Sequence, residues 1–113
     1  MSSRIISDSE VGPHPKHPGV FMRHYFCGAD NDRLNNLELR IDPGFGIPPH
    51  IHEQSTEFFY IISGTGEFLI DGAWHAVGPG QACKAPTGEE HGFRVAAADE
   101  PLLMLATFSP PVR

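Results

Sequence analysis

Proline and glycine interrupt this sequence at short intervals throughout, and that spacing limits the possible folds more than any other feature. The 113 residues include eleven prolines and twelve glycines. No window between them sustains the 3.6-residue period of an amphipathic helix. The runs between them are about five to eight residues long and rich in β-branched and aromatic side chains. Many short strands with evenly spaced turns are typical of a β-sandwich or barrel, so the sequence predicts an all-β fold.

Eight runs are the predicted strands, namely Val20–Cys27, Leu37–Ile41, Glu57–Ser63, Glu67–Ile70, Ala73–Val77, Gln81–Lys84, His91–Val95 and Leu102–Phe108. Asp71-Gly72 separates two of them and predicts a tight hairpin. The segment Gly12–Gly19 is too rich in proline for an interior strand and is expected to be an extended arm. We expect one domain, in which residues 1–33 form an N-terminal arm and strand and residues 34–113 form the barrel.

Charge and hydropathy argue against several classes of partner. Eight basic and fourteen acidic residues give a net charge of -6 without a basic cluster, which argues against nucleic acid. No apolar run approaches the roughly 20 residues that cross a bilayer, and the first residues lack the apolar stretch of a signal peptide. We therefore expect a cytoplasmic protein. Cys27 and Cys83 lack CxxC spacing and are expected to be reduced, although a disulfide between them stays open.

Three histidines and one glutamate form the candidate chemical site. His50 and His52 are separated by one residue, and on a strand such a pair projects from one face, about 7 Å apart at the backbone. Ile51 between them is expected to face the opposite, apolar layer. Glu57 opens the next predicted strand, and His91 begins a later one. Three imidazoles and a carboxylate suit Mn, Fe, Co, Ni, Cu or Zn rather than Ca or Mg.

The chain has seven histidines, and most of them taken singly would be ordinary surface residues. The spacing of the candidate ligands distinguishes them. A first pattern comprises Gly44, His50, His52, Glu57 and Gly64, with five, one, four and six residues between successive members. With five, one and two residues between them, a second comprises Gly80, Pro86, Gly88 and His91. The two patterns resemble the two motifs of the cupin superfamily. The Asn that usually follows is Val95 here, at a position that is not a ligand.

The resemblance extends from about Leu34 to Phe108 and implies a double-stranded antiparallel β-helix, or jelly-roll barrel. It also implies one divalent transition metal per chain, held inside the barrel by the four candidate ligands. Cupins include dioxygenases, isomerases, decarboxylases, lyases, storage proteins and ligand-binding regulatory domains. We expect a metal-dependent enzyme that acts on a small oxygenated molecule chelated by the metal, and an oxidoreductase if the ion is redox-active. The alternative is a non-enzymatic binding or sensor protein.

Strand parity predicts the surroundings of the ion. Phe59 and Ile61 share the face of Glu57, and Phe93 shares the face of His91. The predicted substrate pocket, which could equally be plain core, comprises Phe59, Ile61, Phe93, Met104 and Phe108. Gln54 is a candidate to hydrogen-bond a metal-bound water or substrate, and Glu57 a candidate to accept a proton.

The remaining histidines, His14, His17, His24 and His75, have no partner at ligand spacing, which favours surface or interface roles. Small cupins resemble one another in forming dimers. Because an uncovered apolar edge strand is an aggregation hazard, we expect a homodimer with Val20–Cys27 at the interface.

Overall fold

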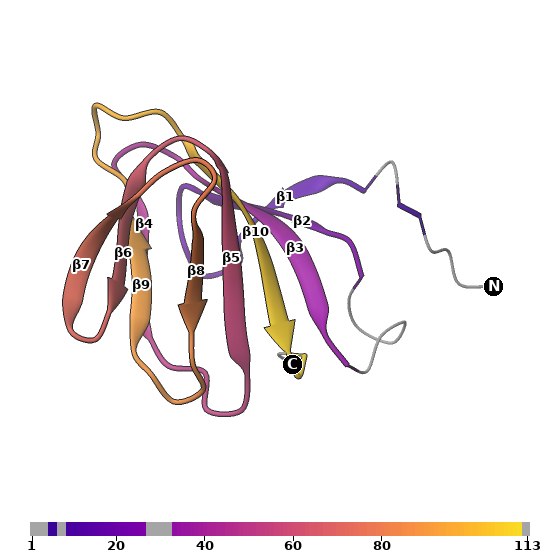
Figure 1. Cartoon of the computed structure of the whole chain (residues 1–113). Helices are drawn as coiled ribbons and strands as arrows, with labels where there is room; N and C mark the ends of the chain where they lie inside the picture. The colour runs from indigo at the N-terminus through magenta and orange to yellow at the C-terminus, as the bar shows by residue number, and fades with distance from the viewer. Residues whose placement is uncertain (1–4, 7–8, 27–32, 112–113) are drawn as a thin grey trace.

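The computed structural model describes residues 5–6, 9–26 and 33–111 (Figure 1). Within these ranges it contains no helix, and its strands are β1 (Val11–Pro13), β2 (Val20–His24), β3 (Asn35–Ile41), β4 (Gly46–His50), β5 (Thr56–Ser63), β6 (Gly66–Ile70), β7 (Ala73–Val77), β8 (Ala82–Ala85), β9 (His91–Arg94) and β10 (Leu102–Ser109). The all-β prediction is confirmed. In the described part of the chain, no helix of a length and apolarity that would cross a membrane is found.

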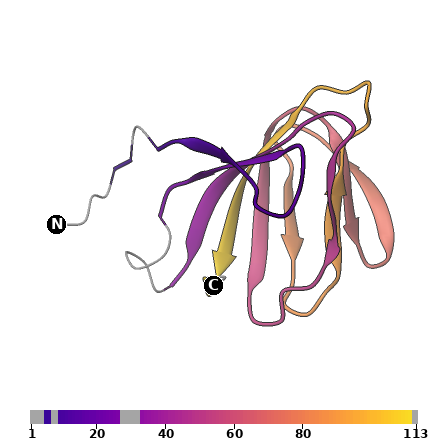
Figure 2. The same ribbon diagram turned by 180° about the vertical axis from the view of Figure 1, so that it is seen from behind.

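The strands form two antiparallel sheets that face each other, as the two views in Figures 1 and 2 show. One sheet has the order β1-β2-β3-β10-β5-β8, and the other has the order β4-β9-β6-β7. Several neighbours, such as β3 and β10 or β4 and β9, are far apart in the sequence, so the chain crosses repeatedly between the two layers. This arrangement is the predicted jelly-roll barrel. The apolar side chains between the sheets form one core.

Strand β5 shows how the sequence produces this layering. Its residues alternate, so that Glu57, Phe59 and Ile61 are buried whereas Phe58 and Tyr60 are about half exposed. Strands β3 and β10, which pair with each other, have the same alternation. Side chains of successive strand residues point to opposite faces, so these three strands present one apolar face to the interior. The face predicted for Phe59 and Ile61 is therefore the interior one.

The predicted hairpin lies between β6 and β7. Ile70 pairs with Ala73, which leaves the two-residue loop Asp71-Gly72. Both loop residues have positive φ, 53° and 72°, as a type I′ turn requires. A different constraint acts at Gly64, where φ is 80° and an added Cβ would lie 2.1 Å from the Pro101 carbonyl oxygen. Only glycine fits that turn without moving the backbone.

Two strands are missing from the sequence-based prediction, and both contain proline. β1 overlaps the start of the predicted extended arm and pairs only with β2, at the edge of its sheet. β4 is the edge strand of the other sheet and includes Pro48 and Pro49. Proline cannot donate to a sheet ladder, so it is tolerated at edges and hides such strands from a search for apolar alternation. The predicted strand Val20–Cys27 ends at His24, and Cys27 lies outside the described residues.

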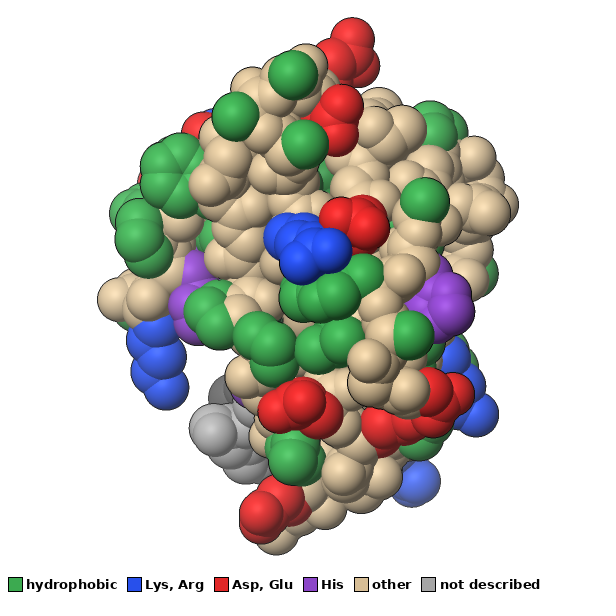
Figure 3. All heavy atoms as spheres, turned by 90° about the vertical axis from the view of Figure 1, so that its left-hand side faces the viewer, with side chains coloured by type: hydrophobic (Ala, Val, Ile, Leu, Met, Phe, Trp, Pro, Cys, Tyr) green, Lys and Arg blue, Asp and Glu red, His purple; other side chains and the backbone are tan. Residues whose placement is uncertain are grey.

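The outer face of the four-stranded sheet carries a small polar cluster. Arg94 pairs with Glu67 at 2.8 Å, and its guanidinium lies 4.0 Å from the centroid of the Trp74 ring. Figure 3 shows this side of the molecule, on which hydrophobic side chains lie around charged ones. On the other sheet, Cys83 is a free thiol that packs against the core, and burial raises its pKa.

Candidate metal centre

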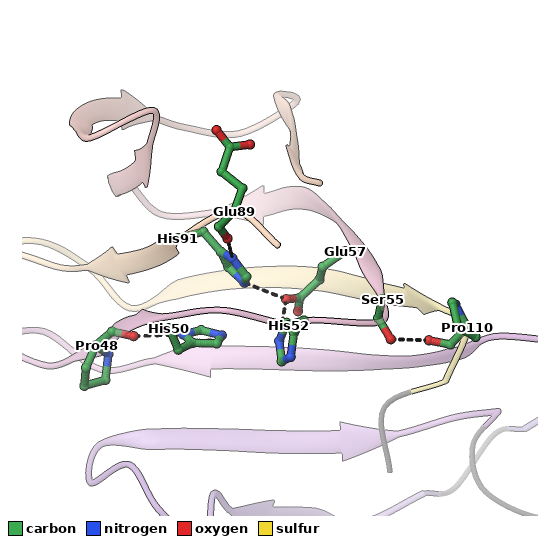
Figure 4. A network of polar contacts seen from close by, with 8 residues as sticks. All are labelled: Pro48, His50, His52, Ser55, Glu57, Glu89, His91 and Pro110. Carbon is green, nitrogen blue, oxygen red and sulfur yellow. Dashed lines mark hydrogen bonds and ion pairs between the residues drawn. The ribbon is translucent and has the colours of Figure 1, made fainter. Parts of the chain in front are cut away.

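The four candidate ligands come from both sheets. His50 is the last residue of β4 and His91 the first of β9, and these two residues are paired across the four-stranded sheet. Glu57 lies near the start of β5 in the six-stranded sheet, and His52 lies in the connection from β4 to β5. Their side chains meet between the sheets, as Figure 4 shows. An ion held by all four would therefore join the two layers.

The approach to the site differs from the regular strand expected around His50 and His52. The register shifts between Ile47 and His50, and β4 ends at His50, so His52 is a loop residue. Ile51 is 51% exposed and lines the cavity beside the site, so the expectation that it faces an apolar layer is wrong. Pro48 and Pro49 have no amide to donate to the ladder, and the register shift falls across them. The two rings nevertheless meet, with centroids 4.8 Å apart.

Two turns are tied together to bring His91 to the other ligands. The Gly88 amide donates to the His52 carbonyl at 2.9 Å, and the Glu89 amide donates to the Pro86 carbonyl at 3.1 Å. Gly88 has a φ of 81°, a value that glycine adopts at little cost. The motif residues Pro86 and Gly88 thus form a turn that is hydrogen-bonded to the loop of His52 and leads into the strand of His91.

Backbone carbonyls orient two of the rings. The Nδ1 atom of His50 lies 2.8 Å from the Pro48 carbonyl oxygen, and that of His91 lies 2.9 Å from the Glu89 carbonyl oxygen (Figure 4). A carbonyl oxygen only accepts, so in both rings Nδ1 carries the proton and donates. The other nitrogen, Nε2, is then free to bind a metal, which is the usual arrangement of ligating histidines.

The burial and contacts of Glu57 are the strongest indication that this site holds a cation. It is 3% exposed, and its Oε1 atom lies 3.2 Å from Nε2 of His91 and 3.3 Å from Nε2 of His52. When the His91 ring is neutral with its proton on Nδ1, Nε2 and the carboxylate oxygen present lone pairs to each other. This contact requires a proton or a metal ion between the two atoms.

All four donor atoms lie within 4.8 Å of one another. Two ligands at about 2.1 Å from one ion are at most about 4.2 Å apart, so small rotations bring the whole set onto a single ion. The donor set fits a transition metal, as the sequence predicted, and the group could hold one such ion. Nitrogen donors outnumber oxygen here, which disfavours Ca and Mg.

The pKa values of two rings are shifted in opposite directions. Burial lowers the pKa of His50, and the neighbouring His91 and His52 add to that effect against the Pro48 carbonyl and Glu57. Burial alone would also lower the pKa of His91, but the Glu57 carboxylate and the Glu89 carbonyl outweigh it and raise the pKa. A proton therefore competes with a metal more strongly at His91 than at His50.

The ligands lie in a cavity of about 540 Å³, a size typical of small-molecule sites. Three predicted pocket residues, Phe59, Phe93 and Phe108, line it. Ile61 and Met104 are fully buried in the core and do not line it. Gln54 is exposed on the loop after His52, outside the lining.

Sequence reasoning missed several residues at this cavity, and three of them have titratable side chains. His14, Lys16 and His17, from the connection between β1 and β2, are among its lining residues. The histidines had been expected in surface or interface roles. The spacing H-P-K-H-P could have drawn attention to them, but only the pairing of β1 with β2 places this segment over the site.

Comparison with known proteins agrees with this geometry. The family model described as "Cupin domain" matches residues 37–108. The "Polyketide synthase CurC" of Streptomyces cyaneus is 28% identical over 113 residues, which cover 97% of this chain and 71% of that protein. Among solved structures, the polyketide cyclase RemF from Streptomyces resistomycificus is 28% identical with a TM-score of 0.82, over 100% of this chain and 84% of that one. KdgF from Halomonas sp. is 26% identical with a TM-score of 0.75, over 86% of this chain and 85% of that one. The chain belongs to the cupin domain family.

Proposed function

We propose that this cupin is a metal-dependent enzyme for a small oxygenated organic molecule, whose oxygen atoms chelate an ion held by His50, His52, Glu57 and His91. The observation that carries the proposal is the position of the ligands. His91 and Glu57 are almost fully buried, yet all four ligands line one cavity that also includes the exposed Ile51. A closed structural metal site would have no such access.

When bound, the ion would supply Lewis acidity and positions open to substrate oxygen, and with a redox-active metal also electron transfer. The chain's own residues have separate tasks. The carbonyls of Pro48 and Glu89 fix the His50 and His91 rings. Phe59, Phe93 and Phe108 keep water from the walls beside the ligands. Glu57 is the only carboxylate at the site among the described residues and is the proposed proton acceptor.

The relatives support a substrate with several oxygen atoms. Two of the similar proteins named above are described as a polyketide synthase and a polyketide cyclase, at 28% identity each. Polyketide chains carry carbonyl groups at regular intervals, and a pair of them can chelate one ion. The apolar lining of the cavity suits the carbon skeleton between them. We therefore propose multicarbonyl and phenolic compounds as the first substrates to examine.

The test is a screen of such compounds with the Mn, Fe, Co, Ni, Cu and Zn forms of the protein. Product formation and O₂ consumption are followed together, which separates oxygenation from isomerisation, cyclisation or elimination. Turnover by at least one metal form, abolished by a chelator, is expected. Tight binding without product from any form would contradict the enzyme proposal and favour a ligand-binding or sensor protein.

Glu57→Gln tests the proton acceptor. The amide keeps the shape of the side chain but cannot take up the proton, so turnover should fall much more than substrate affinity. Glu53→Gln, which changes an exposed carboxylate in the neighbouring loop, is the matched control and should keep full turnover. Equal losses in turnover and affinity for Glu57→Gln would assign Glu57 to metal binding alone.

Gln54→Ala tests whether Gln54 reaches the substrate or a bound water from its exposed loop. A rise in KM or a fall in kcat is expected if it does. Unchanged kinetics would remove Gln54 from the proposed site.

A further inference from the structure

The connection between β1 and β2 forms a fixed part of the cavity wall. The His14 amide donates to the Val20 carbonyl at 2.8 Å, and the Val20 amide donates to the His17 carbonyl at 3.3 Å. Beside it, Pro13 is paired with Phe21 in the sheet. His14, Lys16 and His17, here called the mouth turn, line the same cavity as the metal ligands. The backbone bonds fix these three residues relative to the site.

The lysine and the carboxylate that line the cavity differ in their surroundings. Among the described lining residues, Lys16 is the only lysine or arginine and Glu57 the only carboxylate. Glu57 already contacts His52 and His91. No carboxylate in the described ranges forms an ion pair with Lys16. With a divalent ion present, the cavity is positive although the chain has a net charge of -6. Such a local field attracts an anion.

The mouth turn also presents hydrogen-bond donors. The Lys16 amide donates to Nδ1 of His14 at 3.0 Å, so in the neutral His14 ring the proton is on Nε2, which can donate to a ligand. The rings of His14 and His17 are 4.3 Å apart at their centroids. Burial lowers the pKa of His14, and the neighbouring His17 and Lys16 lower it further. The turn thus offers one ammonium group and a neutral imidazole N–H.

We propose that the mouth turn binds a carboxylate of the substrate, at the end opposite to the oxygen atoms that chelate the ion. This inference rests on the proposed function, because it assumes a ligand that enters the cavity and reaches the ion. The walls of the cavity include the apolar residues Met22, Leu39 and Phe108. The ligand class is therefore an apolar, typically aromatic, body with a chelating oxygen pair at one end and an anionic group at the other.

Two matched probes test the proposal on the full-length protein loaded with Zn, which avoids oxidation of the probes. The first is 3,4-dihydroxycinnamate, which has a chelating catechol and a distal carboxylate. The second is its methyl ester, which has the same catechol and no charge. Calorimetry should show tighter binding of the acid. Lys16→Met should weaken the acid about tenfold, as expected for a lost hydrogen bond between charged groups, and leave the ester unchanged. Lys84→Met, at an exposed lysine outside the lining, should alter neither.

Charge reversal provides a second measurement that a purely structural role of Lys16 would not affect. Lys16→Glu should reverse the preference, so that dopamine, a catechol with a distal ammonium group, binds more tightly than the acid. Equal affinity of the wild-type protein for acid and ester, or equal losses for both in Lys16→Met, would overturn the proposal. The proposed function fails on a different result, the absence of turnover in all metal forms, so the two failures are distinguishable.

Discussion

Metal binding should stabilise this protein strongly, because the ion would join the two sheets. His50 and His91 lie on one sheet, Glu57 lies on the other, and His52 is in the loop between them. An ion bound by the folded chain alone shifts the unfolding equilibrium by mass action. The informative perturbation is His50→Ala. This side chain is half-buried, and its ring lies beside the rings of His52 and His91. Its removal therefore takes away one ligand without opening a large core cavity.

The expected size of the effect follows from the chain length. At a metal concentration 100 times Kd, the stabilisation is about 2.7 kcal/mol. A chain of 113 residues has an entropy of unfolding of about 240 cal/mol/K, so 1 kcal/mol corresponds to about 4 °C in Tm. The wild-type protein should therefore gain about 11 °C. If the loss of one ligand weakens binding about 100-fold, the same concentration should raise Tm of His50→Ala by only about 2 °C.

Differential scanning calorimetry of metal-free and metal-loaded protein gives both shifts, and elemental analysis gives the metal content. His75→Ala removes an exposed histidine of β7 and should keep the full shift. The reasoning is refuted if His50→Ala retains the wild-type shift and metal content. It is also refuted if none of Mn, Fe, Co, Ni, Cu and Zn stabilises the wild-type protein.

Three further outcomes are expected. The pKa of His91 is raised from 6.5, so a proton still competes with the metal for Nε2 above that pH. Metal affinity, measured by competition with a chelator, should therefore keep rising with pH beyond 6.5. A plateau at pH 6.5 would contradict this. Met104→Ala, at a fully buried position, should cost about 2–5 kcal/mol of unfolding free energy by denaturant titration, with a cost below 1 kcal/mol refuting its core role. We expect a homodimer with the N-terminal strand at its interface, so light scattering should give twice the mass of the chain. A monomer mass at micromolar concentration would count against it.

The sequence predicted strands best where a continuous apolar run lies between turn residues. β5 and β10 were found because each is such a run, although apolar side chains occupy both of their faces and the buried alternation appears only in the structure. β4 was not found, because its two prolines conceal a strand that has a neighbour on only one side. The predicted ligands were identified by spacing, and the structure brings all four together. Short connections limit the relative positions of His50, His52 and Glu57, whereas His91 is 34 residues beyond Glu57 and reaches them through the pairing of β9 with β4.

The alternation of side chains along a strand predicted which residues face the interior. It did not predict how far along the barrel each residue lies from the ligands. Phe108 pairs with Glu57, and Ala106 pairs with Phe59, so this end of β10 lies at the site. Met104 pairs with Ile61 two residues further along, which places both in the core away from the ligands. The position of the mouth turn depends on the pairing of β1 with β2. No local pattern in the arm predicts that pairing.

The proline pair of β4 has a consequence for how molecules of this protein meet one another at high concentration. An open sheet edge invites a strand from a second molecule, the first step of many aggregation reactions. Pro48 and Pro49 carry no amide donor, so the row of backbone donors on the strand that ends in His50 is interrupted. A foreign strand would find no continuous ladder there. The rim with the candidate ligands can therefore stay accessible to small molecules without inviting fibrous association.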